Sequence, residues 1–95
     1  MAEKVRAHIF VLGKVQGVFF REKTKKKAEE FGVSGWVKNL KDGRLEVVFE
    51  GEPEKVEKMI KWAKRGPFFA KVENFDLTWE TCTDEFNEFE IRYDL

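Results

Sequence analysis

The order of two sequence periodicities along the chain restricts its fold more than any other feature. Alternation of apolar and polar residues is typical of a half-buried strand, whereas an apolar spacing of three and four residues is typical of an amphipathic helix. Alternating segments cover residues 4–13, 33–40, 44–50, 70–80 and 88–95. Helical spacing covers residues 21–31 and 53–65. The predicted order is therefore β-α-β-β-α-β followed by a short terminal strand.

Local signals support these boundaries. Gly32 predicts the end of the first helix, because glycine is the usual left-handed residue after a helix. Pro53 stands where the first turn of a helix tolerates proline. Asp42-Gly43 between two alternating runs indicates a β-hairpin. An apolar stripe on the second helix predicts the face that packs on the sheet: Val56, Met59, Ile60 and Ala63.

This order of elements predicts an α+β fold of the ferredoxin-like split β-α-β type. In that arrangement two helices cover one face of an antiparallel sheet. With 95 residues the chain has room for one such domain, and we expect it to span residues 1–95.

Charge and cysteine content narrow the function. The 18 basic residues balance 18 acidic ones, which argues against a broad surface for nucleic acid or an anionic membrane. A single cysteine, Cys82, excludes an intrachain disulfide and fits a reducing cytoplasm. No apolar run approaches the roughly 18 residues of a membrane span. We expect a cytoplasmic monomer with no nucleic-acid or membrane partner, and no metal, since no cluster of Cys, His or carboxylates has metal-ligand spacing.

The predicted topology brings together two polar residues that are far apart in the sequence. The first and second strands run in the same direction with the third between them, so their ends lie at one sheet edge, about 10 Å apart. Arg21 follows the loop after the first strand, and Asn39 lies near the end of the second. We therefore expect the two side chains at one site.

The loop before Arg21 has the features of an anion-binding site. Gly17 permits backbone angles at which successive N–H groups converge on an anion, and the following helix adds its N-terminal N–H groups and dipole. The Arg21 guanidinium is a planar fork suited to two phosphate oxygens. No Gly-Lys-Ser/Thr of a P-loop is present. Two plainer interpretations stay open: Arg21 as a solvated residue at a helix start, and Asn39 as a strand-end or turn cap.

Two long motifs resemble the acylphosphatase family. They are Gly13-x-Val15-Gln16-Gly17-Val18-x-Phe20-Arg21 and Gly35-Trp36-Val37-Lys38-Asn39-Leu40-x-Asp42-Gly43-Arg44-Leu45-Glu46-Val47. Two later segments are also similar, Gly66-Pro67-x-x-Ala70-x-Val72 and Phe89-x-Ile91. The resemblance thus covers essentially the whole chain. Lys41 departs from the pattern, since many relatives carry proline or a small polar residue there, and this departure bears on turn rigidity and rate.

The resemblance implies a hydrolase that cleaves acyl phosphates to a carboxylate and inorganic phosphate without metal or cofactor. Arg21 matches the phosphate-binding arginine of the family, and Asn39 matches the residue that orients the attacking water. The backbone N–H groups that match the phosphate cradle belong to Val15, Gln16, Gly17, Val18, Phe19 and Phe20. So few polar groups suffice because a carboxylate leaves readily through a loose transition state, where positioning and charge stabilisation do most of the work.

The remaining reactive side chains are interpreted as structural. His8 lies in the middle of a strand, away from the loop, and Cys82 has no supporting motif for nucleophilic chemistry. The basic run at residues 23–27 is flanked by glutamates and is typical of a solvated helix face. Candidates for contact with the acyl group at the mouth of the site are Phe19, Phe68 and Phe69.

A non-catalytic binding module on the same fold is the alternative. An RNA-binding sheet would stack bases on strand aromatics such as His8 and Phe10, and a small-ligand-binding domain would also fit because fold does not determine function. The expected third strand, residues 44–50, lacks the ribonucleoprotein signature.

Overall fold

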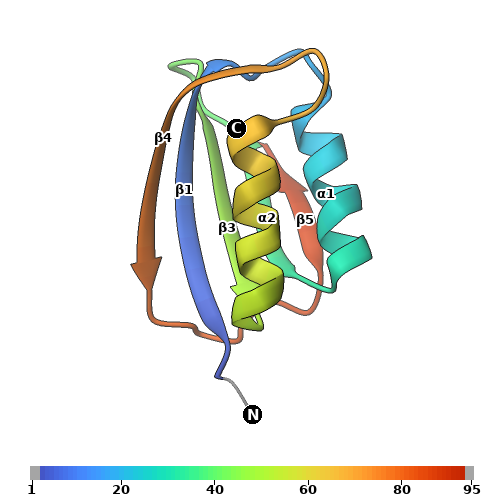
Figure 1. The fold of residues 1–95 in the computed structure, drawn as a ribbon, viewed down its shortest axis with the longest axis vertical. Helices are drawn as coiled ribbons and strands as arrows, with labels where there is room; N and C mark the ends of the chain where they lie inside the picture. The colour runs from blue at the N-terminus through green and yellow to red at the C-terminus, as the bar shows by residue number, and fades with distance from the viewer. Residues whose placement is uncertain (1–2, 94–95) are drawn as a thin grey trace.

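The computed structural model describes residues 3–93, which form five strands and two helices (Figure 1). The strands are β1 (Val5–Lys14), β2 (Ser34–Asn39), β3 (Leu45–Gly51), β4 (Lys71–Glu80) and β5 (Phe89–Arg92). The helices are α1 (Phe20–Phe31) and α2 (Pro53–Arg65). Every predicted element is present with ends within one residue of prediction, except the end of the last strand, which was predicted to reach residues outside the described part.

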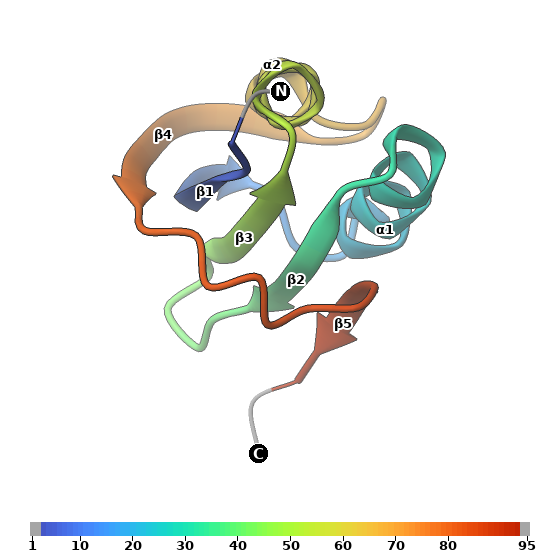
Figure 2. The ribbon, with the colours of Figure 1, turned by 90° about the horizontal axis from the view of Figure 1, so that it is seen from below.

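The strands form one sheet in the order β4-β1-β3-β2-β5, with both helices on the same face (Figures 1 and 2). β3 is antiparallel to both β1 and β2, so β1 and β2 run in the same direction, as predicted. The expectation of an antiparallel sheet needs one correction. β5 pairs with β2 in parallel, which makes the sheet mixed. The reason is that the chain leaves β4 at one end of the sheet and crosses to the far edge before β5 begins, so β5 starts at the same end as β2 (Figure 2).

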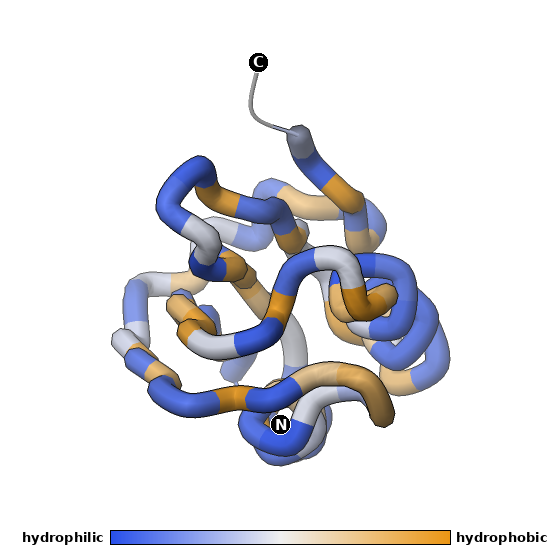
Figure 3. The backbone as a smooth tube through the Cα atoms, turned by 90° about the horizontal axis from the view of Figure 1, so that it is seen from above, coloured by the Kyte–Doolittle hydropathy of each residue, from blue (hydrophilic) through white to orange (hydrophobic). Residues whose placement is uncertain are grey.

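The hydrophobic core lies between the sheet and the helices. The four residues of the predicted α2 stripe are all buried. On α1 the inward residues are Phe20, Thr24 and Ala28. Along β1 buried residues alternate with partly exposed ones, as expected for a sheet with one face on the core. Figure 3 shows hydrophobic and hydrophilic residues interspersed along the backbone. Within residues 3–93, neither helix is long and apolar enough to cross a membrane.

The predicted hairpin between β2 and β3 has a three-residue loop, residues 41–43. The Gly43 N–H donates to the Leu40 carbonyl at 3.2 Å, and the Leu40 N–H donates to the Arg44 carbonyl at 2.8 Å. Gly43 has φ of 96°. The turn is therefore followed by a left-handed glycine, which is the usual form of a three-residue hairpin loop.

The fourth strand contains a β-bulge. Pairing between β1 and β4 shifts from Leu12–Asn74 to Gly13–Val72, which leaves Glu73 as the extra residue. Gly13 has φ of 129°, and a Cβ there would overlap the Lys71 carbonyl oxygen. Glycine is thus required where the chain leaves the sheet for the loop.

The segment between β4 and β5, residues 81–88, is tied to the sheet by Glu50, whose side chain is 1% exposed. The Glu50 carboxylate accepts hydrogen bonds from the backbone N–H groups of Thr83 at 3.0 Å and Asp84 at 3.1 Å, and from the Arg6 guanidinium at 3.1 Å. Burial disfavours the charged form, but these hydrogen bonds outweigh it and lower the pKa of Glu50.

Arg6 completes this network with two further carboxylates. It contacts Glu80 at 2.9 Å and Glu85 at 3.3 Å in addition to Glu50. We name these four residues the Arg6 cluster. It fixes the route by which the chain reaches β5, and β5 in turn lies beside β2.

Candidate active site

Arg21 and Asn39 line the same cavity, near the end of β2 and the start of α1. The cavity has a volume of about 140 Å³, and its other lining residues are Val15, Gly17, Phe19, Phe20 and Glu22. An adjoining cavity of about 270 Å³ is also lined by Arg21 and Asn39, together with Leu40, Lys41, Arg92 and Tyr93. The predicted meeting of Arg21 and Asn39 is confirmed, while their roles in a reaction stay predictions.

The loop between β1 and α1 is anchored in the core by three buried side chains. Val15, Val18 and Phe20 are each at most 4% exposed. Between them, Gly17 and Phe19 have left-handed backbones with φ of 72° and 65°. Left-handed residues within such a loop turn successive N–H groups toward one side, which is the geometry of a backbone anion nest.

Phe19 is also the N-cap of α1, and no side chain of the described residues 3–93 caps the first turn of this helix. The first N–H groups of a helix have no acceptor within the helix. An anion held at the loop therefore gains both the nest and the positive end of the helix dipole.

Asn39 is the last residue of β2, where it pairs with Leu45 of β3. Its side-chain Oδ1 is buried and has no hydrogen-bond partner among residues 3–93. A buried acceptor without a donor costs roughly 1–3 kcal/mol and is uncommon in native proteins. A strand-end or turn cap would use this oxygen within the protein, so that plainer interpretation of Asn39 does not account for its environment.

Arg21 lies in the first turn of α1 and is half-buried. Within residues 3–93 it makes no ion pair with a carboxylate, and its guanidinium lies over the Tyr93 ring, 5.1 Å from the ring centroid. Stacking orients a guanidinium and leaves its in-plane N–H donors for an anion. The contact with Tyr93 was not predicted, because it depends on the placement of β5 beside β2.

Gln16 joins the loop to the hairpin that follows Asn39. Its Nε2 donates to the Leu40 carbonyl at 2.8 Å and to the Arg44 carbonyl at 2.9 Å, the two residues that flank the hairpin loop. Both amide hydrogens are thus used on the hairpin. The sequence motif predicts a role for the backbone of Gln16 and does not predict this role of its side chain.

His8 and Cys82 lie outside the cavity, as predicted. The His8 ring nitrogens contact Glu46 at 2.6 Å and Glu80 at 2.8 Å. Partial burial opposes the charged imidazole, but the hydrogen bonds to the two carboxylates outweigh it and raise the pKa of His8. Burial raises the pKa of the Cys82 thiol, which keeps it protonated and unreactive. No group of His, Cys, Asp and Glu within residues 3–93 is arranged to hold a metal ion.

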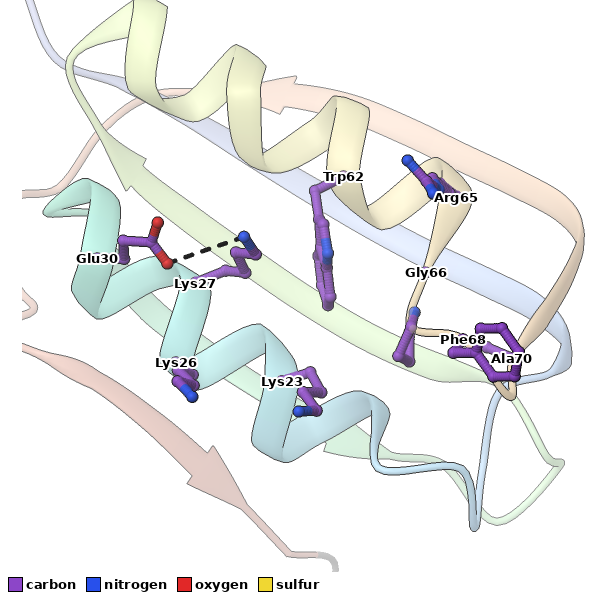
Figure 4. Close-up of a pocket in the computed structure, with 10 residues that line it drawn as sticks. Lys23, Lys26, Lys27, Glu30, Trp62, Arg65, Gly66, Phe68 and Ala70 are labelled. Carbon is purple, nitrogen blue, oxygen red and sulfur yellow. Dashed lines mark ion pairs between the residues drawn. The ribbon is translucent and has the colours of Figure 1, made fainter.

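A larger groove of about 820 Å³ lies between the two helices (Figure 4). Neither Arg21 nor Asn39 lines it. Its cations are Lys23, Lys26 and Lys27 of α1 and Arg65 of α2, with a Lys27–Glu30 ion pair at 3.8 Å. The basic run at residues 23–27 therefore faces this groove and solvent and does not line the cavity of Arg21.

Comparison with known proteins decides the family. A model of the acylphosphatase family matches residues 7–91. The acylphosphatase of Roseiflexus sp. (strain RS-1) is 52% identical over 91 residues, covering 96% of this chain and 98% of the relative. The chain belongs to the acylphosphatase family. The acylphosphatase of Pyrobaculum calidifontis is 54% identical over 90 residues, covering 94% of this chain and 82% of that protein.

Solved acylphosphatase structures agree with this assignment. The enzyme from Coxiella burnetii superposes with a TM-score of 0.88 at 42% identity and covers 94% of this chain and 93% of its own. The enzyme from Bacillus subtilis gives a TM-score of 0.89 at 34% identity, covering 94% and 99%. Hydrolysis of acyl phosphates to a carboxylate and inorganic phosphate is therefore the activity of this chain.

Proposed function

We propose that the Arg21–Asn39 cavity is the active site of this acylphosphatase. The phosphate is held by the Arg21 guanidinium and by the backbone N–H groups of Val15, Gln16, Gly17, Val18, Phe19 and Phe20. Asn39 positions the attacking water. The observation that carries the proposal is that Asn39, whose buried Oδ1 has no partner within residues 3–93, lines the same cavity as Arg21, which forms no ion pair with a carboxylate of those residues.

Arg21 and the loop act on the charge of the phosphoryl group. In a loose transition state, negative charge spreads over the three equatorial oxygens of the phosphoryl group. A guanidinium and preorganised N–H donors stabilise that charge without reorganisation during the reaction. The Tyr93 ring, 5.1 Å from the guanidinium carbon, keeps Arg21 in place before substrate binds.

Asn39 acts on the water. Its Oδ1 accepts a hydrogen bond from a water molecule and so directs a water lone pair at phosphorus, in line with the departing carboxylate. An amide is not a base at neutral pH, so the proton passes from the water to the phosphate oxygens as the bond forms. The carboxylate leaves without protonation because it is a stable anion. Neither step requires a metal, and we propose that the reaction proceeds without one.

The alternative of an RNA-binding sheet is disfavoured by the contacts of its aromatics. The Arg44 guanidinium lies over the Phe10 ring at 4.8 Å from the centroid, and the His8 ring is bound between Glu46 and Glu80. Trp36 is 9% exposed. Bases cannot stack on rings that are already covered, and carboxylates beside His8 repel a phosphate backbone.

We further propose that the enzyme acts as a monomer in the cytoplasm, as one domain over residues 1–95, without nucleic-acid or membrane partners. The balanced charge and the single cysteine support this. Light scattering at several protein concentrations tests the monomer directly.

The test of the proposed site is hydrolysis of benzoyl phosphate in the presence of EDTA. We expect wild-type turnover to persist in EDTA and to fall by about 10²–10³ in Arg21→Ala and in Asn39→Ala. Arg65→Ala and Asn74→Ala are matched controls, since Arg65 lines the groove between the helices and Asn74 is exposed on β4. Full activity in folded Arg21→Ala, or loss of wild-type activity in EDTA, would overturn the proposal.

A further inference from the structure

Phe19 is an aromatic residue that the fold does not bury. It is 61% exposed, whereas its neighbours Val18 and Phe20 are 4% and 2% exposed. Phe19 is also absent from the hydrophobic core cluster and from the residues packed against it. Packing therefore gives no reason for a phenylalanine at this position.

The backbone gives no reason for it either. Phe19 has φ of 65° and ψ of 20°, a left-handed conformation that disfavours side chains other than glycine, asparagine and aspartate. Glycine or asparagine would suit this N-cap better, and asparagine would add a capping oxygen. Strained residues of this kind concentrate at functional sites.

The position of Phe19 indicates what the ring contacts. Phe19 lines the same cavity as Arg21 and Asn39. Of the exposed residues of that cavity, Gly17 has no side chain, Glu22 is charged, and Phe19 offers an apolar surface. When a phosphate lies on Arg21 and the loop N–H groups, the acyl group must extend from the small cavity over its exposed rim, where the Phe19 ring lies.

We propose that Phe19 is a specificity-determining residue that contacts the acyl group and makes aromatic acyl phosphates better substrates than acetyl phosphate. This inference rests on the proposed function of the cavity. Contact between an acyl ring and the Phe19 ring favours the aromatic substrate by about three- to tenfold in kcat/KM. The substrate class is thus acyl phosphates with a flat, apolar acyl group.

Phe68 provides a matched control. It is 93% exposed and belongs to the loop after α2, but it lines the groove between the helices and does not line the cavity. Replacing Phe68 removes an exposed ring of the same size without touching the proposed site.

The experiment measures kcat/KM for benzoyl phosphate and acetyl phosphate in wild type, Phe19→Asn, Phe19→Leu and Phe68→Asn. Asparagine accepts the left-handed backbone, so Phe19→Asn removes the ring and keeps the loop conformation. We expect the benzoyl-to-acetyl ratio to fall about three- to tenfold in Phe19→Asn, to fall less in Phe19→Leu, and to stay at the wild-type value in Phe68→Asn.

A binding measurement covers the case in which a Phe19 variant turns over too slowly. Phenacylphosphonate and acetonylphosphonate replace the bridging oxygen of the two substrates by a methylene group and are not hydrolysed. The ratio of their dissociation constants, measured by calorimetry, is expected to change as the kcat/KM ratio does.

An unchanged ratio in Phe19→Asn, by rate or by binding, overturns the inference. An equal change in Phe68→Asn does the same, because it would assign the preference to exposed aromatics in general. Arg21→Ala distinguishes the two proposals. If Arg21→Ala keeps its activity, the proposed site is wrong, whereas an inactive Arg21→Ala with an unchanged ratio in Phe19→Asn rejects the role of Phe19 only.

Discussion

Arg6 of β1 and Arg21 of α1 are two arginines of the same domain with opposite surroundings. Arg6 lies within 3.3 Å of three carboxylates, those of Glu50, Glu80 and Glu85. Arg21 makes no ion pair within residues 3–93, and Asn39 in the same cavity keeps a buried oxygen without a donor. Both regions carry polar groups out of water, but the partners found within residues 3–93 satisfy those of the Arg6 cluster and leave Asn39 Oδ1 without a donor.

This difference indicates two roles for buried polar groups, one in stability and one in ligand binding. A satisfied cluster stabilises the position of a segment, because removing one member leaves its partners uncompensated. An unsatisfied group lowers stability, by roughly 1–3 kcal/mol, and its retention indicates a ligand that completes it. We therefore expect substitutions in the Arg6 cluster to affect stability, and substitutions in the cavity to affect activity.

The largest expected effects come from replacing Arg21 and Arg6, one at a time, by alanine. Arg21→Ala lowers kcat/KM for benzoyl phosphate by about 10²–10³ and changes the free energy of unfolding by less than about 1 kcal/mol, since Arg21 makes no ion pair within residues 3–93. Arg6→Ala lowers the free energy of unfolding by about 2 kcal/mol or more and leaves the activity of the folded enzyme near that of wild type. Urea unfolding and steady-state kinetics on both variants test this. Large losses of both activity and stability in each variant would contradict the distinction between the cavity and the Arg6 cluster.

Gln16→Leu tests whether the loop and the hairpin must be joined for activity. Leucine fills a similar volume but loses two hydrogen bonds to carbonyls, so the loop can shift relative to Asn39. We expect kcat to fall roughly 10- to 100-fold and stability to fall by about 1–2 kcal/mol. Lys14→Leu, at an exposed position where the loop starts, is the control and leaves both unchanged. Wild-type kcat in Gln16→Leu would show that the contact is not needed.

Glu50→Ala tests whether the Arg6 cluster contributes to the stability of the fold. It removes the acceptor of the Thr83 and Asp84 backbone N–H groups and one of the three carboxylates around Arg6, and we expect the free energy of unfolding to fall by about 2–4 kcal/mol. Glu85→Ala removes an exposed member of the cluster and costs less than about 1 kcal/mol. Because the pKa of Glu50 is lowered in the folded protein, its contribution is present above the unfolded pKa of about 4.3 and is lost as pH falls through the folded value. Equal losses in both variants, by urea unfolding at pH 7, would contradict this account.

His8→Gln gives the smallest expected effect. The pKa of His8 is raised in the folded protein, so its contribution is fully present below the unfolded pKa of about 6.5 and is lost as pH rises through the folded value. We expect wild type to exceed His8→Gln in stability by about 1 kcal/mol or less at pH 6, and by less at pH 9. Turnover per folded molecule should not depend on this substitution, because His8 lies outside the cavity. If the stability difference between wild type and His8→Gln grows as pH rises, the direction assigned to the His8 pKa shift is wrong.

Most of the fold could be predicted because each element carries its own local signal. Gly32 has φ of 73°, and its N–H donates to the Glu29 carbonyl at the end of α1. The apolar stripe of α2 is buried residue by residue. The direction of β5 could not be predicted, because it depends on hydrogen bonds from Thr83 and Asp84 to a glutamate more than thirty residues earlier.

The sequence predicted which two side chains meet at the site. It did not predict the residues that hold them in place. The order of strands was enough to bring Arg21 and Asn39 to one cavity. The contacts of Gln16 and Tyr93 follow from hairpin and edge-strand positions that no local pattern determines. The left-handed backbone of Phe19 is likewise set by the entry into α1, and a phenylalanine does not indicate such a conformation, because bulky residues rarely adopt it.

The separate roles proposed for Arg21, which binds the phosphate, and Asn39, which positions the water, are tested most directly by inhibition of Asn39→Ala with inorganic phosphate. If Asn39 positions the water and does not hold the phosphate, kcat falls by about 10²–10³, while the inhibition constant for phosphate stays near the wild-type value. In Arg21→Ala both quantities worsen together. A phosphate inhibition constant that rises in Asn39→Ala in step with the loss of kcat, or a kcat that stays at the wild-type value, would contradict the account.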